Sequence, residues 1–200
     1  MMPDAMTERQ RLVNLLATRS VKTGRFTLAS GKISDLYIDA RLTTMSPEGL
    51  SLIGPLAIQM LKAARWELDS VGGLTLGADP IAYSISYASN FTPPLLRAFT
   101  IRKEAKTHGT GRLIEGSFLR GDRVVVVEDV ITTGSSALKA VDAIKAAGGD
   151  IAGLFALVDR EEGGREAIEA AGYRVISVTH RSELMSLILR PSEHPDSAAS

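Results

Sequence analysis

The sequence lacks cysteine, so disulfide bonds, thiolate catalysis and cysteine-ligated metals are excluded together. It also lacks any apolar run near the ~20 residues that a membrane-spanning helix needs. The stretch 1–10 carries polar and charged residues where a signal peptide would have its apolar segment. These absences lead us to expect a cytoplasmic protein with no membrane partner.

An excess of charge of either sign is missing as well. The 23 Lys and Arg residues balance the 23 Asp and Glu residues, which gives a formal net charge of +0. Bulk nucleic-acid binding depends on excess positive charge, so we expect no nucleic-acid partner. The 200 residues, of which 44% are hydrophobic, are typical of one large soluble domain.

The first third of the chain predicts two helices and short strands. The spacing of apolar residues between Thr7 and Arg19 fits an amphipathic helix. Residues 26–39 alternate partly and contain Gly and Ser, which favours short antiparallel strands. Ser46 followed by Pro47 is typical of a helix start, and this helix is expected to end near Ala64.

Strands and helices alternate from about residue 71 onward. Four consecutive valines, Val124 to Val127, indicate a central strand that is buried on both faces. The pattern predicts an α/β fold with a mostly parallel sheet flanked by helices. The strands are expected at 71–76, 95–101, 123–127, 151–158 and 174–178, and the helices at 80–89, 135–147 and 165–171.

The segment that follows the valine strand has the composition of a ligand site. Glu128 and Asp129 come first, then the hydroxyl- and Gly-containing residues 130–134, and a helix begins at Ser135. The backbone N–H groups of such a loop and the N-terminus of the helix form a cradle for a phosphate. Because carboxylates repel a phosphate, the acidic pair is better suited to sugar hydroxyls or a magnesium ion. A helix cap made by the Thr and Ser side chains is the alternative.

A second segment after a predicted strand is basic. Two glycines, Gly109 and Gly111, follow a group of cationic or titratable side chains. A cationic clamp of this kind stabilises a departing pyrophosphate. A solvated charged turn is the alternative. The group consists of Arg102, Lys103, Lys106 and His108.

These segments resemble a known family. Glu128-Asp129-Val130-Ile131-Thr132-Thr133-Gly134 resembles the phosphoribosyl pyrophosphate (PRPP) motif of type I phosphoribosyltransferases. Residues 102–109 resemble the R-K-x-x-K-x-H-G signature of orotate phosphoribosyltransferases, and residues 26–34 resemble their F-x-L-x-S-G-x-x-S segment. The resemblance implies the type I phosphoribosyltransferase fold with a small N-terminal hood. It also implies transfer of 5-phosphoribosyl from PRPP to orotate in pyrimidine biosynthesis.

The resemblance carries a set of site residues with it. Orotate would contact Tyr37, Thr132 and Arg160. The catalytic residues would be Lys103, Lys106, His108 and Asp129. PRPP would be bound by Lys22, Arg102, Lys103, Lys106, His108, Glu128, Asp129, Val130, Ile131, Thr132, Thr133, Gly134, Ser135 and Ser136.

The resemblance further implies Mg²⁺ and a homodimer with a shared active site. The metal would be carried by PRPP without a direct protein ligand, and Glu128 and Asp129 would reach it at most through its bound water. Lys103 would serve the partner subunit's PRPP. We expect a single domain over residues 1–190, with the hood mainly at 1–65 and the core at about 66–180. The polar residues 191–200 are expected to form a disordered tail.

Some features depart from the family pattern or allow another interpretation. Leu76-Gly77 stands where many bacterial members have Tyr-Lys, so that lysine contact to pyrophosphate is missing. Arg160 could pair with the neighbouring Glu161 or Glu162 instead of a ligand, and Lys22 could be an ordinary exposed lysine. The alternative functions are a phosphoribosyltransferase for a purine or another base, and a PRPP-sensing regulator without turnover.

Overall fold

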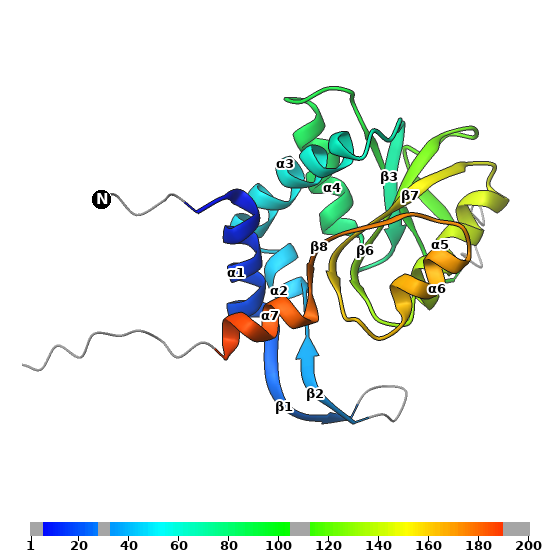
Figure 1. The fold of residues 1–200 in the computed structure, drawn as a ribbon. Coiled ribbons are helices and arrows are strands. Elements are labelled where there is room, and N and C mark those ends of the chain that lie inside the picture. Colours follow the sequence, from blue (N-terminus) through cyan, green and yellow to red (C-terminus); the bar gives the residue numbers. More distant parts are fainter. Residues whose placement is uncertain (1–5, 28–32, 105–112, 190–200) are drawn as a thin grey trace, which may run out of the picture.

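The computed structural model describes residues 6–27, 33–104 and 113–189, and its centre is a six-stranded sheet (Figure 1). The tail expected at 191–200 lies outside the described residues. The strand order is β5-β4-β3-β6-β7-β8, and all neighbours are parallel except the antiparallel pair β4 and β5. The predicted mostly parallel sheet is therefore confirmed. The strands are β3 (Ser70–Leu74), β4 (Arg97–Ile101), β5 (Ile114–Gly116), β6 (Arg123–Ile131), β7 (Asp150–Asp159) and β8 (Val175–His180).

Helices cover both faces of this sheet. The first buried cluster joins side chains of α1, α3, α4 and α7 to one face, and the second joins α5 and α6 to the other. None of the helices in the described residues is long and apolar enough to cross a membrane. The helices are α1 (Glu8–Ser20), α2 (Arg41–Thr44), α3 (Pro47–Ala63), α4 (Asp79–Ser89), α5 (Ser135–Ala146), α6 (Gly164–Ala170) and α7 (Arg181–Ile188).

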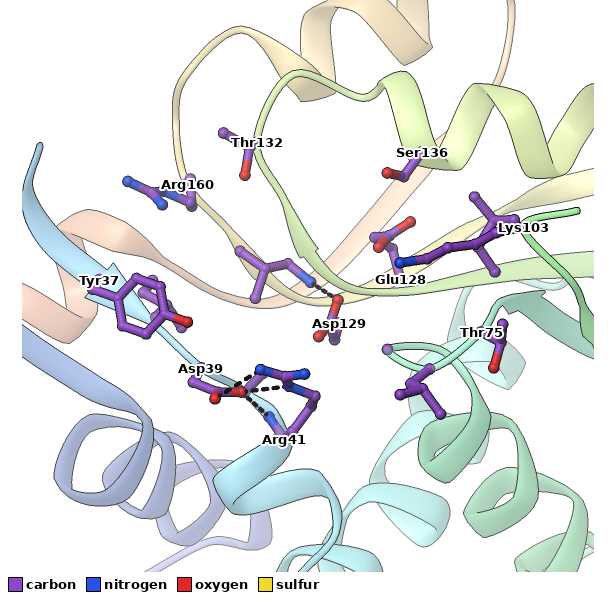
Figure 2. A pocket seen from close by; sticks show the side chains of 16 residues that line it. Tyr37, Asp39, Arg41, Thr75, Lys103, Glu128, Asp129, Thr132, Ser136 and Arg160 are labelled. Atoms are coloured by element: carbon purple, nitrogen blue, oxygen red, sulfur yellow. Dashed lines mark hydrogen bonds and ion pairs between the residues drawn. The ribbon is translucent and has the colours of Figure 1, made fainter. Parts of the chain in front are cut away.

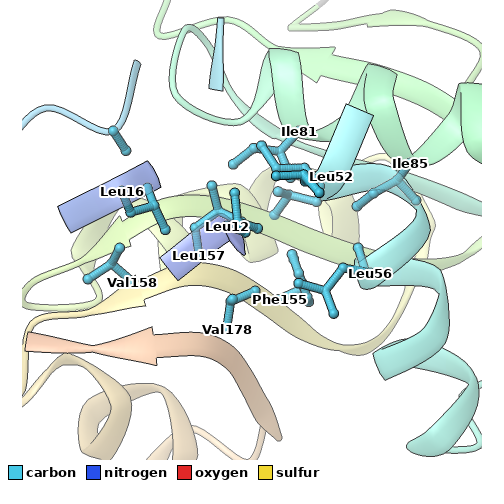
Figure 3. Packing of buried hydrophobic residues seen from close by; sticks show 14 of the residues in the cluster. Leu12, Leu16, Leu52, Leu56, Ile81, Ile85, Phe155, Leu157, Val158 and Val178 are labelled. Atoms are coloured by element: carbon cyan, nitrogen blue, oxygen red, sulfur yellow. The ribbon is translucent and has the colours of Figure 1, made fainter. Parts of the chain in front are cut away.

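The valine run of β6 divides its side chains between the two buried clusters. Val125 and Val127 belong to the cluster under α1, α3 and α4, whereas Val124 and Val126 belong to the cluster under α5. All four are fully buried, as predicted for a central strand. Figure 3 shows the first cluster, where leucines of α1 and α3 meet β7 at Phe155. This packing fixes the carboxyl end of β6 relative to its neighbours.

One predicted boundary is wrong in a way that matters for the site. The strand predicted at 123–127 continues to Ile131, because its ladder with β7 extends to the pair Ile131 and Asp159. Glu128 and Asp129 therefore lie within β6 rather than after it. The ladder is formed by backbone groups and does not require apolar side chains. The prediction therefore ends the strand too early, where the apolar run gives way to acidic residues.

Three short elements and one strand start were not predicted from the sequence. β5 has three residues and α2 has four, so neither is long enough to show a hydrophobic period. The helix α7 presents one fully buried residue, Leu184. The predicted antiparallel strands exist as β1 (Val21–Thr27) and β2 (Ile33–Ile38), but β1 begins directly after α1. In Figure 1 this hairpin extends away from the sheet.

Candidate active site

A cavity of about 340 Å³ opens at the carboxyl ends of β3, β6 and β7 (Figure 2). The end of β2 and the start of α2 form its other wall, so residues far apart in the sequence meet here. Its lining consists of Tyr37, Ile38, Asp39, Ala40, Arg41, Leu74, Thr75, Leu76, Gly77, Lys103, Glu128, Asp129, Val130, Thr132, Ser136 and Arg160.

The cavity brings together many of the site residues expected from the sequence. In the view of Figure 2, Thr132 and Arg160 lie on one side of the acidic pair, and Lys103 and Ser136 lie on the other. Expected residues that line this cavity are Tyr37, Lys103, Glu128, Asp129, Val130, Thr132, Ser136 and Arg160. Lys22 and Arg102 are not part of its lining, and Lys106 and His108 lie outside the described residues.

A smaller cavity of about 60 Å³ adjoins at the N-terminus of α5. Gly134 caps this helix with φ +77°, and no side chain forms a capping hydrogen bond there. The alternative of a Thr or Ser helix cap is therefore wrong. The first-turn N–H groups of a helix have no partner within the helix, so an uncapped end suits an anion. The lining consists of Glu128, Val130, Ile131, Thr132, Thr133, Gly134, Ser135, Ser136 and Ala137.

The loop of this smaller cavity is held from behind by α6. A Cβ atom built on Gly134 would lie 2.8 Å from the carbonyl oxygen of Gly164. A Cβ atom on Gly164 would lie 2.5 Å from the carbonyl oxygen of Thr132. Both contacts are too short for any other residue, so the two glycines allow the loop and α6 to pack backbone against backbone. This packing fixes the N–H groups that face the cavity.

The carboxyl groups of Glu128 and Asp129 line the larger cavity, and the pKa values of both are raised. Burial is the largest cause that raises the pKa of Glu128 to about 8, and the neighbouring charge of Asp129 adds to it. Burial also raises the pKa of Asp129, while the N–H of Val130, which donates to Oδ1 at 2.9 Å, opposes this. Neutral Glu128 can donate a hydrogen bond as well as accept one, which suits the hydroxyls of a sugar.

The loop after β3 lines the cavity without a lysine. Leu76 and Gly77 line the cavity. Asp79, the first residue of α4, fixes the loop through hydrogen bonds. The Asp79 carboxylate accepts a hydrogen bond from Thr75 Oγ1 at 2.6 Å and another from the hydroxyl of Thr100 on β4. The departure from the Tyr-Lys pattern therefore leaves a fixed loop that presents backbone and the half-exposed Leu76 to the cavity.

Asp39 and Arg41 line the cavity and were not identified from the sequence. Arg41 donates to Asp39 from Nε at 2.8 Å and from Nη2 at 3.0 Å. This pairing lowers the pKa of Asp39, and the Arg41 charge also acts to lower the pKa of Asp129. They do not follow a strand of the six-stranded sheet, where ligand-binding residues are expected, because β2 belongs to the separate hairpin. The sequence signal that could have identified them is their position two and four residues after Tyr37, which was expected to contact orotate.

Two expected residues belong to the N-terminal hairpin, and of these Tyr37 lines the cavity whereas Lys22 does not. Lys22 is exposed and stands opposite Tyr37 in the hairpin, and its charge acts to lower the pKa of Asp39. The Tyr37 ring lies 5.6 Å from that of Phe26, measured between centroids. A second aromatic ring, from Phe26 of β1, is therefore present beside Tyr37.

Arg102 and Lys103, which follow the end of β4, have different surroundings. Arg102 lies outside the cavity, with Nη1 at 3.9 Å from a carboxylate oxygen of Glu115. Lys103 lines the cavity of its own chain, on the side of Glu128 (Figure 2). The family resemblance assigns Lys103 to a partner subunit, whereas in the single chain described it faces its own site.

Arg160 is almost completely buried and lies in the cavity wall with Thr132. Its Nη2 lies 2.7 Å from Oε1 of Glu162 and 3.2 Å from Oγ of Ser34. The ion pair with one of the neighbouring glutamates, which the sequence left open, therefore exists. The buried Nε atom has no partner among the described residues. The described chain thus leaves part of the hydrogen-bonding capacity of the guanidinium unused.

Comparison with known proteins gives one consistent result. A family model described as "Phosphoribosyl transferase domain" matches residues 46–183. The orotate phosphoribosyltransferase of Aquifex aeolicus is 48% identical over 183 residues, which is 90% of this chain and 99% of the relative. That of Mycobacterium tuberculosis strain H37Rv is 46% identical over 177 residues, 88% of this chain and 96% of the relative. The solved structure of Mycobacterium tuberculosis H37Rv orotate phosphoribosyltransferase in complex with PRPP has a TM-score of 0.76 at 41% identity, covering 90% of this chain and 99% of that chain.

Proposed function

This chain belongs to the phosphoribosyltransferase family, among its orotate phosphoribosyltransferases, and from this membership we propose the reaction and the roles of its residues. The chain transfers the 5-phosphoribosyl group of PRPP to orotate and releases orotidine 5'-monophosphate and pyrophosphate. This is a pentosyl transfer of pyrimidine biosynthesis.

One observation supports this reaction above the others. A nearly buried guanidinium, Arg160, lines the same cavity as the acidic pair, and this cavity shares lining residues with the smaller cavity at the uncapped N-terminus of α5. A carboxylated base, a ribose and a phosphate need these three environments side by side. A purine has no carboxylate for Arg160, and this disfavours the alternative of a purine substrate.

The PRPP end of the site divides into three parts. The cradle of residues 131–136 receives the 5-phosphate through backbone N–H groups. Glu128 and Asp129 receive the ribose hydroxyls. The diphosphate meets the cations, which are Lys22, Arg41, Arg102, Lys103, Lys106 and His108.

The acidic pair also fits a magnesium ion that PRPP carries into the site, because such an ion needs few protein ligands. Mg²⁺ keeps several waters and takes one or two carboxylates together with substrate phosphates. Among the described residues no cluster of three or more His, Cys, Asp or Glu could hold a metal alone. We therefore assign the ion to PRPP, with Glu128 and Asp129 contacting its bound water. When bound, it neutralises charge on the diphosphate.

The chemistry is a displacement at the ribose C1 carbon. The bond to pyrophosphate breaks largely before the bond to the orotate nitrogen forms, so positive charge develops on the ribose. The cationic residues stabilise the departing pyrophosphate, and the cavity walls hold the two reactants in line. No step in this scheme needs a covalent enzyme intermediate.

The homodimer and the cytoplasmic location expected from the sequence belong to the same proposal. The different surroundings of Arg102 and Lys103 support a shared site, because Lys103 lines the cavity of its own chain and Arg102 does not. In a dimer, the cation that its own site does not use would serve the PRPP of the partner subunit.

The test of the reaction is turnover with a panel of bases. Orotate absorbance should decay when PRPP and magnesium are added, and adenine, guanine, hypoxanthine and uracil should give no comparable product. Preferred turnover of a purine would replace orotate as the substrate. PRPP binding without turnover of any base would favour the regulator.

A further inference from the structure

Arg160 uses only part of its guanidinium within the described chain. Its contacts to Glu162 at 2.7 Å, to Ser34 Oγ at 3.2 Å and to the Leu36 carbonyl at 3.5 Å all come from Nη2. Nε is buried without a partner among the described residues. A guanidinium can bind a carboxylate through two N–H groups at once, so this arrangement is incomplete.

Glu162 reaches Arg160 from outside the reaction cavity. A second cavity of about 660 Å³ is lined by Arg160 and Glu162, together with Ser34, Asp35, Glu161 and Arg181. Glu162 does not line the reaction cavity, whereas Arg160 lines both. About a third of the Glu162 side chain is exposed, against 6% of that of Arg160. Glu162 can therefore turn into solvent, while Arg160 stays in place.

A buried guanidinium must remain paired. Removing its partner leaves an uncompensated buried charge, which is strongly unfavourable. Glu162 meets this need when no ligand is bound. A ligand carboxylate that approaches from the reaction cavity can take over the pairing, so that one anion replaces another. An uncharged ligand offers no replacement and leaves the Arg160–Glu162 pair as it is.

We propose that Glu162 is the resident counterion of Arg160 and that the carboxylate of the bound base replaces it, which makes Glu162 a residue that sets the affinity for carboxylated ligands. The inference rests on the proposed function, since it takes orotate and its nucleotide as the carboxylated ligands. In this scheme Glu162 competes with the substrate carboxylate and does not hold Arg160 for it.

The decisive measurement uses two nucleotides that differ only in the carboxylate. Orotidine 5'-monophosphate carries it and uridine 5'-monophosphate lacks it, and neither reacts without pyrophosphate. Their dissociation constants are measured by calorimetry for the wild type and for Glu162→Gln, which keeps the shape but removes the charge. The variant should bind orotidine 5'-monophosphate about threefold to tenfold more tightly, with unchanged affinity for uridine 5'-monophosphate.

The neighbouring glutamate provides a matched control. Glu161 accepts hydrogen bonds from the N–H and Oγ of Ser182, each at 2.9 Å. Glu161→Gln removes the same charge one residue away and should leave both dissociation constants unchanged. Tighter binding in both variants would mean a general charge effect and would overturn the proposal.

Weaker or unchanged binding of orotidine 5'-monophosphate by Glu162→Gln would also overturn it, because Glu162 would then orient Arg160 or have no influence. If Glu162→Gln does not fold, Glu162→Asp is the second variant. It shortens the side chain that pairs with Arg160 and should tighten the binding of orotidine 5'-monophosphate by a smaller factor. Failure of the proposed function is visible separately. In that case the wild type itself would not prefer orotidine 5'-monophosphate over uridine 5'-monophosphate.

Discussion

Gly77 lies against the carboxylate of Asp129. A Cβ atom built on Gly77 would stand 2.6 Å from Oδ1 and 2.7 Å from Cγ of Asp129. The same Oδ1 accepts the N–H of Val130 at 2.9 Å, so the carboxylate is not free to retreat. The loop after β3 can approach the acidic pair only because this position has no side chain.

Gly77→Ala should therefore disturb both stability and substrate binding. We expect a loss of about 1–3 kcal/mol in the free energy of unfolding, as for overpacked sites, and a raised KM for PRPP. Denaturant unfolding and steady-state kinetics measure the two effects. Asp129→Ala removes the clashing atoms, so the double variant should lose less stability than the sum of the single losses. Simple additivity would show that the contact with Asp129 is not the cause.

Glu128 should make the stability of the free protein depend on pH. Its pKa is raised from 4.5 to about 8 in the folded protein, so folding favours the protonated form. The corresponding stabilisation is complete below the unfolded pKa and is lost as the pH rises through the folded value. Between about pH 5 and about pH 8.5, the free energy of unfolding should fall more for the wild type than for Glu128→Gln. Parallel curves would mean that Glu128 is already ionised in the folded protein. The exposed Glu166→Gln is the control and should follow the wild type.

Arg41 supplies a cation where the loop after β3 has none. It lines the same cavity as Gly77 and is held by Asp39 through two hydrogen bonds, at 2.8 and 3.0 Å. Because Arg41 is about half exposed, we expect Arg41→Gln to raise the KM for PRPP by only about threefold to tenfold, with little change for orotate. Arg25→Gln, on the same hairpin but outside the lining of this cavity, should change neither constant. Equal effects of the two variants would remove Arg41 from the site.

Arg160→Ala should affect the other substrate. Loss of a charge-assisted pair with a carboxylate amounts to about 1.5–3 kcal/mol, so the KM for orotate should rise roughly tenfold to a hundredfold. The KM for PRPP should change far less, because the cradle and the acidic pair remain. Both constants come from the same steady-state experiment. A comparable rise in both would indicate a collapsed cavity rather than a lost base contact.

Local patterns of the sequence predicted the parts of the site that one segment builds alone. The phosphate cradle is one strand, one loop and one helix start, and its glycine and hydroxyl residues are adjacent in the chain. The wall that contains Asp39 and Arg41 could not be found in this way, since it depends on where the end of the separate hairpin lies relative to the sheet. The ion-pair partner of Arg160 could also not be identified without the three-dimensional structure. Glu161 and Glu162 are equivalent in the sequence, but Glu161 is engaged by Ser182 of α7, a helix that the periodicity did not predict.

The shared active site can be tested by mixing two damaged subunits. Lys103→Ala removes a cation that would be lent to the partner, and Asp129→Asn removes a charge that acts within its own cavity. Each homodimer should be nearly inactive. In a mixed dimer both lesions would fall on one site, because the subunit that carries Asp129→Asn is also the one that receives no lysine from its partner. The other subunit keeps its own Asp129 and receives an intact Lys103, so the second site of that dimer would work.

Random assortment of equal amounts of the two variants gives about half heterodimer. Each heterodimer would carry one working site of two, so activity should recover toward about a quarter of the wild type. The alternative follows from the described chain, in which Lys103 lines its own cavity. If Lys103 acts there, each site of the mixed dimer keeps one lesion and no activity returns. Subunit exchange, followed with differently tagged chains, must be demonstrated for this result to count. Full exchange without recovery would assign Lys103 to its own subunit's PRPP and exclude it as the residue that is lent to the partner.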